Sequence, residues 1–274
     1  MSDQPDQVVV YRRYTQLQSI RSVLFPDTAP NGLAGLLLTC VGFGSEGAEL
    51  ALATTIAGGT FLGVDPSTEN LKAAVRNGSC DFMVNTLDEA LRVLKNELRK
   101  KKALSVGLLG DAKAILPAMV ERGVQPDLVA DSRVSKNDTD ASDIQPALRT
   151  LVQRGAVQVD RGAAQNSLAS ELLEVTWTAN NIADLRHMDE LALRQLPAAD
   201  AIRRRWLEQA PGYFHRQRPL QRVVGMHPDE VMRLTEEFRR AHSAGEIQSK
   251  PALAWATIDG SKQSIPTVKS LRKS

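Results

Sequence analysis

The sequence predicts an α/β fold in which a doubly wound parallel sheet carries helices on both of its faces. Two observations predict it. Short apolar runs, typical of buried parallel strands, alternate with segments of helical periodicity as far as residue 131. A glycine-rich turn, CVGFGSEGAE at residues 40–49, follows the first of these runs and opens a helical segment. Together these features favour a Rossmann-like domain, a class of sheet in which such turns hold dinucleotides.

The expected elements follow in order along the chain. A helix with apolar residues at helical spacing is expected at residues 15–24, and Pro26 ends it. Four strands, each a short apolar run, are expected at residues 33–39, 60–65, 103–109 and 128–130. The helices that follow the first three strands, or lie between them, are expected at residues 44–57, 66–77, 87–100 and 112–122.

Beyond Asp131 the alternation weakens and a polar loop is expected at 132–143. Helices are expected near residues 145–155, 162–173, 184–209 and 227–245, with a short strand at 222–225. We expect three parts: a flexible N-terminal end at 1–14, a single Rossmann-like α/β domain at 15–260, and a loose basic tail at 261–274.

The composition narrows the classes of function. The chain has 34 basic and 32 acidic residues and a net charge of +2, which gives no reason to expect a nucleic-acid or anionic-membrane partner. Two cysteines do not make a disulfide framework, so a reducing cytoplasm is the expected location. No signal peptide opens the sequence, and no apolar run is long enough to span a membrane.

The glycine turn predicts a phosphate site. Gly42 would allow the tight turn after the strand, Gly44 would let a pyrophosphate approach the backbone, and Gly47 would let the helix pack closely. Backbone N–H groups at the helix start would then bind the phosphates. Asp65 ends the next strand 18 residues after Gly47, where a carboxylate binds an adenosine ribose and favours NAD over NADP.

Two carboxylates complicate this interpretation. Glu46 and Glu49 stabilise a helix N-terminus, but the same charges would compete with a bound pyrophosphate if they faced it. The sequence leaves both orientations open, and it leaves open a purely structural turn.

Other candidate sites are sparse. The four histidines have no metal-ligand spacing, so no metal site is expected. Cys40 fits a small buried hydrophobe better than a nucleophile, because no base is placed beside it in the sequence. No catalytic residue can be identified.

Several segments resemble the urocanase (urocanate hydratase) family. They are LLTCVGFGSEGAELALATTIAG at 37–58, LSVGLLGDA at 104–112 and RGVQPDLVAD at 122–131. Urocanases use tightly bound NAD⁺ to hydrate urocanate, so the resemblance implies an NAD-binding Rossmann-like domain and a possible homodimer. It implies cofactor contacts at Gly42, Phe43, Gly44, Ser45, Glu46, Gly47, Asp65, Asp111 and Ala112. Asn70 stands near the position of a cofactor-binding arginine in that family.

The resemblance fails where the family carries its catalytic groups. Residues 132–136 replace the segment that wraps the nicotinamide, and residues 221–225 lack the active-site cysteine. Residues 255–258 lack the ionisable groups of a further conserved segment. We therefore expect a urocanase-like NAD-binding protein that does not hydrate urocanate and that acts in binding, sensing or assembly.

Two alternatives stay open. One is an NAD-dependent hydratase (a lyase) acting on urocanate or a related imidazole acrylate in histidine catabolism, with a site completed in an oligomer. The other is a structural or interaction protein that binds no nucleotide.

Overall fold

The computed structural model describes residues 4–24, 32–133, 143–160 and 171–257. The chain forms two compact units, Met1–Ala164 and Gln165–Ser274. This division differs from the single domain expected at 15–260. The reason lies in the strands: those of the second unit pair with one another in a separate antiparallel sheet.

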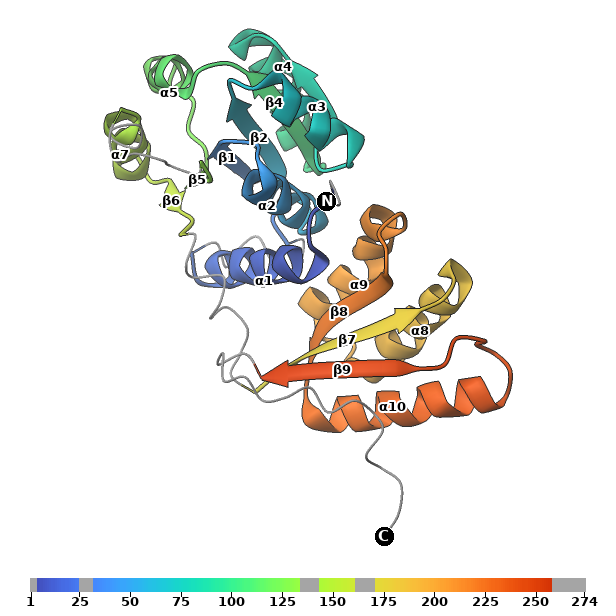
Figure 1. Cartoon of the computed structure of the whole chain (residues 1–274). Helices are drawn as coiled ribbons and strands as arrows, with labels where there is room; N and C mark the ends of the chain where they lie inside the picture. The colour runs from blue at the N-terminus through green and yellow to red at the C-terminus, as the bar shows by residue number, and fades with distance from the viewer. Residues whose placement is uncertain (1–3, 25–31, 134–142, 161–170, 258–274) are drawn as a thin grey trace. The chain divides into compact units, whose positions relative to one another are not determined.

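The first unit is built on a six-stranded parallel sheet (Figure 1). Its strands are β1 (Leu37–Val41), β2 (Thr60–Asp65), β3 (Phe82–Val84), β4 (Leu104–Leu109), β5 (Leu128–Asp131) and β6 (Val157–Gln158). Their order is β3-β4-β2-β1-β5-β6, so the chain changes direction across the sheet between β1 and β5. Open sheets of this kind bind ligands at such a switch point, beyond the carboxyl ends of the strands.

Helices cover both faces of this sheet, as predicted. They are α1 (Gln7–Leu24), α2 (Ser45–Ile56), α3 (Thr68–Arg76), α4 (Leu87–Lys100), α5 (Ala112–Glu121) and α7 (Gln145–Gln153). Apolar residues of α4, α5 and α7 share one core with Leu62 and Val64 of β2. The strand residues between these point to the opposite face of the sheet, which α2 and α3 cover; there Gly107 of β4 lies next to Leu71 of α3. Helix α1 packs along α2. The expected α/β, Rossmann-like fold is confirmed for this unit.

The N-terminal end differs from the prediction. Residues 7–14 form the first half of α1 instead of a flexible segment, and Val10, Tyr11 and Tyr14 are fully buried. Gln16 anchors the helix, since its Nε2 donates to the carbonyl of Asp160 over 2.7 Å. The expected tail at 261–274 lies outside the described residues.

The second unit has a three-stranded antiparallel sheet in the order β8-β7-β9. Its elements are β7 (Leu173–Ala179), α8 (Ile182–Gln195), α9 (Ala201–Phe214), β8 (Leu220–Met226), α10 (Pro228–Ser243) and β9 (Ala252–Thr257). The helix expected at 184–209 is two helices, because the backbone becomes extended at Leu196, before Pro197. The helix expected at 162–173 lies mostly outside the described residues, and Leu173 begins a strand.

A buried ion pair lies in the core of this unit. Arg222 of β8 donates to Asp189 of α8 over 2.8 Å, and both side chains are almost completely buried. Trp177 completes the cluster with an indole hydrogen bond of 3.1 Å to Asp189. Among the helices that the structure describes in either unit, none is long and apolar enough to cross a membrane.

Candidate functional site

The glycine turn connects β1 to α2, and its backbone requires glycine at two positions. Gly42 has φ of +89°, a conformation that side chains rarely adopt, and its N–H donates to the carbonyl of Val64 over 2.8 Å. At Gly47 a Cβ atom would lie 2.2 Å from the carbonyl oxygen of Gly42. Only glycine therefore lets α2 start this close to the end of β1.

Gly44 differs from these two glycines. It is the N-cap of α2 with φ of −70°, and a Cβ atom placed on it would meet nothing within 4 Å. The first backbone bond of the helix runs from Ala48 N–H to the carbonyl of Gly44, over 2.9 Å. The N–H groups before Ala48 belong to the helix N-terminus, where backbone donors have no partner inside the helix. The turn therefore leaves open space beside a helix start that favours anions.

Asp65 joins the glycine turn to the start of α3. Its carboxylate is buried at the end of β2, where Oδ2 accepts from Phe43 N–H over 2.5 Å and Oδ1 from Ser67 N–H over 2.7 Å. The Asn70 amide adds bonds of 3.2 Å to Oδ2 and 3.4 Å to Oδ1. The predicted ribose acceptor is thus already hydrogen-bonded by three residues of its own chain.

Phe43 lies inside the fold. The residue is 2% exposed, and its ring packs edge-on with that of Phe61 at a centroid distance of 5.4 Å and covers Gly63 of β2. A Cβ atom at Gly63 would lie 2.2 Å from the Phe43 ring, so the strand needs a glycine there. Phe43 therefore holds the turn on the sheet through its ring and through its N–H.

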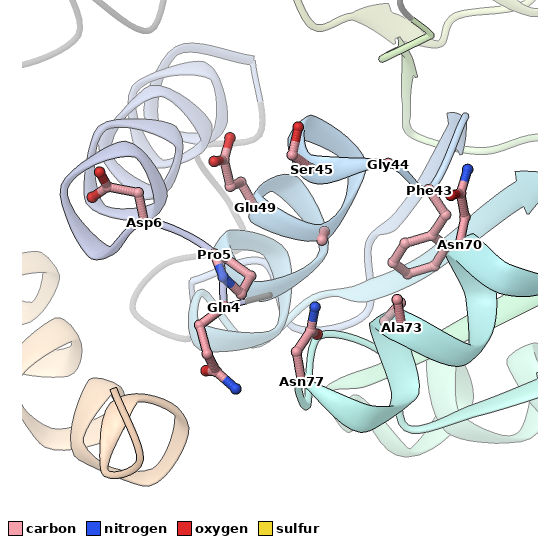
Figure 2. Close-up of a pocket in the computed structure, with 12 residues that line it drawn as sticks. Gln4, Pro5, Asp6, Phe43, Gly44, Ser45, Glu49, Asn70, Ala73 and Asn77 are labelled. Carbon is pink, nitrogen blue, oxygen red and sulfur yellow. The ribbon is translucent and has the colours of Figure 1, made fainter. Parts of the chain in front are cut away.

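A groove of about 400 Å³ opens between α2 and α3, next to Gly44 (Figure 2). Its lining residues are Gln4, Pro5, Asp6, Phe43, Gly44, Ser45, Ala48, Glu49, Asn70, Ala73, Ala74 and Asn77. Amides and two carboxylates supply most of its polar groups, and none of these described lining residues is basic. The described part of the groove thus offers a ligand hydrogen bonds and carboxylates but no positive side chain.

The structure separates the two carboxylates of the helix start. Glu49 lines the groove, and burial raises its pKa to about 7, with Arg13 acting against this shift and Asp6 and Glu46 adding to it. Glu46 lines a hollow of about 10 Å³ with Arg13 and Asp131 instead. Ser45 is exposed and lines the groove. Of the two, Glu49 is the one that faces the groove.

Ser132 was not among the predicted site residues, yet it closes the glycine turn from the β5 side. Its hydroxyl lies 2.7 Å from the carbonyl oxygen of Gly42 and 3.1 Å from that of Val41. Arg133 follows and pairs with Asp131 through Nε at 2.9 Å and Nη2 at 2.8 Å. The sequence feature that could have indicated this contact is the position of Ser132 directly after β5, a strand that pairs with β1.

Cys40 lies beside this contact and is fully buried, with its sulfur 3.3 Å from Ser132 Oγ. Burial raises the pKa of its thiol to about 12, so thiolate is scarce at neutral pH. The structure supports the interpretation of Cys40 as a small buried hydrophobe.

Asp111 and Ala112 lie at the start of α5. Asp111 is an exposed N-cap whose carboxylate accepts from Lys113 N–H over 2.9 Å. Ala112 is buried in the core that α4, α5 and α7 share. Neither residue is among those that line the groove.

A parallel sheet with a glycine turn beside its switch point, and with a carboxylate at the end of the next strand, defines a Rossmann-like domain. Residues 14–141 match the family model of the urocanase Rossmann-like domain. This part of the chain is therefore similar to the Rossmann-like domain of urocanases, and the resemblance read from the sequence is confirmed. The match ends before the second unit begins.

One solved structure is described as "The structure of PKMT2 from Rickettsia typhi in complex with AdoHcy". It is 14% identical to this chain and has a TM-score of 0.32. The similarity covers 72% of this chain and 32% of the other, so the chain spans about a third of that protein. A likeness at this level carries no argument about fold or ligand.

Within the described residues, no group of three or more His, Cys, Asp or Glu side chains could hold a metal ion.

Proposed function

We propose that the first unit binds NAD through the adenosine diphosphate half of that molecule. The observation that carries this proposal is the open space at Gly44, which adjoins both the start of α2 and a groove of about 400 Å³. The backbone turn of the fold class is kept at Gly42 and Gly47, and the strand beside it ends in Asp65.

The residues have distinct roles in the proposal. N–H groups at the start of α2 would hold the pyrophosphate, and the bare Cα of Gly44 would let it approach. Asp65 would accept hydrogen bonds from the ribose hydroxyls. Since none of the lining residues that the structure describes is basic and Glu49 faces the groove, we expect weaker binding than a pocket with a positive side chain would give.

We further propose that the protein does not hydrate urocanate. The segment that aligns with the family's cysteine region lies in β8, where Val224 is fully buried and no thiol is present. The two cysteines of the chain, Cys40 and Cys80, are buried, and burial raises the pKa of each to about 12. The protein would act instead in binding, sensing or assembly. The homodimer implied by the resemblance stays a prediction.

The test is calorimetric titration of the full chain with NAD, together with the variant Gly44→Val. A Cβ atom at Gly44 meets nothing within 4 Å and φ there is ordinary, so we expect a side chain at this position to obstruct the ligand, and the melting temperature of Gly44→Val checks that the fold is kept. Gly212→Ala in α9 is the control, since space is open there too and the site is in the other unit. We expect saturable heat for the wild type and the control, and none for Gly44→Val.

Two results would overturn this proposal. Absence of heat and of thermal shift at millimolar NAD would favour an interaction protein without nucleotide, a candidate that the internal bonding of Asp65 also favours. Loss of urocanate absorbance on addition of the protein would favour the hydratase instead.

A further inference from the structure

Asn70 covers the carboxylate on which the proposed ribose contact depends. Asp65 is 3% exposed, whereas Asn70 is an exposed residue of the first turn of α3. Its amide reaches back to both oxygens of Asp65, at 3.2 Å and 3.4 Å. The same residue lines the groove beside Gly44 (Figure 2).

The four hydrogen bonds to Asp65 are of two kinds. Those from the backbone of Phe43 and Ser67 are short, at 2.5 and 2.7 Å, and they belong to the two turns that Asp65 joins. Those from Asn70 are longer and come from a side chain that can rotate into water. A carboxylate has about four acceptor positions, so two remain for a ligand only when Asn70 moves away.

We propose that Asn70 is a specificity-determining lid on Asp65, which the vicinal hydroxyl groups of a ribose must displace. The inference rests on the proposed function and goes beyond it, because it names the residue that sets the affinity of that site. A ribose with both hydroxyls replaces both bonds of the amide. A ribose that lacks one hydroxyl replaces a single bond and leaves one acceptor position empty.

The test uses ADP and 2′-deoxy-ADP as probes, titrated into the wild type and into Asn70→Ala and Asn70→Leu. Alanine uncovers the carboxylate, so ADP should bind about fivefold more tightly, the factor expected when the two long bonds from the one amide nitrogen together compete like one ordinary hydrogen bond. Leucine covers Asp65 without donating, so it should give no gain. The gain in Asn70→Ala should be smaller for 2′-deoxy-ADP, and it should vanish in Asp65→Asn/Asn70→Ala.

Asn96→Ala is the matched control, since it removes an exposed asparagine from α4, where its amide donates to Glu97. Melting temperatures of all variants separate binding from folding. If the wild type binds ADP and Asn70→Ala binds equally or more weakly, the lid is disproved while the proposed function stands. If only Asn70→Ala binds, the lid is supported and nucleotide binding by the native chain is not. If neither the wild type nor Asn70→Ala binds ADP, the lid and the proposed function are both overturned.

Discussion

The hydroxyl of Ser132 lies 2.7 Å from the carbonyl oxygen of Gly42, although the two residues are 90 positions apart in the chain. This bond joins the end of β5 to the glycine turn, on the side of the turn that faces away from Asp65. The turn is thus held from two strands, through Ser132 on one side and Asp65 on the other.

Removal of the Ser132 hydroxyl should therefore weaken the turn. We expect Ser132→Ala to lower the free energy of unfolding by about 1 kcal/mol, the usual net value of a buried hydrogen bond, and to weaken NAD binding. Urea denaturation and calorimetry measure the two effects. Ser22→Ala, which removes an exposed hydroxyl from α1, should change neither. Equal stability of both variants would mean that the bond does not support the turn.

Gly47 should tolerate no side chain. A methyl group there would meet backbone at 2.2 Å, so Gly47→Ala should cost about 1–3 kcal/mol of stability through overpacking and displace α2 from the turn. Gly44→Ala is the contrast, because its Cβ enters open space. The prediction fails if thermal melting places the two variants at the same temperature.

Glu49 should make stability depend on pH. Its ordinary pKa is 4.5 and burial raises the folded value to about 7, so between these values the folded state binds more protons than the unfolded state. Stability should then fall as the pH rises from 4.5 to 7, and the loss should be complete above that window. Glu49→Gln removes this contribution while Asp6, Glu46 and Arg13 remain. Urea denaturation at pH 5, 6, 7 and 8 should show wild type losing stability relative to the variant; parallel curves would contradict the prediction.

The buried pair Asp189–Arg222 should matter to the second unit. Asp189→Ala leaves a buried guanidinium without its carboxylate and should cost about 3–5 kcal/mol. Asp229→Ala removes an exposed partner of Arg233 and should change little. Calorimetric melting of both variants provides the comparison. An equal, small effect would show that Arg222 finds another partner.

Much of the first unit could be predicted because its central strands are buried on both faces and therefore read as apolar runs, as in Leu104–Leu109. Strands β3 and β6 were missed because they have three and two residues. The start of α1 was missed for another reason: Gln7, Arg13 and Gln16 are buried beside Val10 and Tyr11, so no apolar face marks the helix.

The candidate site, like the fold, could be predicted only in part. The roles of Gly42 and Gly47 follow from local geometry, and a spacing pattern predicts them. The contacts of Ser132 with Gly42 and of Asn70 with Asp65 depend on where strands and turns meet in space, which the sequence does not state. NAD binding stays a prediction.

The contact between Gln16 and Asp160 limits how far the first unit can be shortened at either end. The segment matched by the family model, 14–141, would divide α1 and omit α7 and β6. A fragment with those limits would lose the buried Val10 and Tyr11 and leave β5 as an open sheet edge, prone to pairing with other chains. The stretch that relates this chain to a family is therefore smaller than the piece that can be expected to fold.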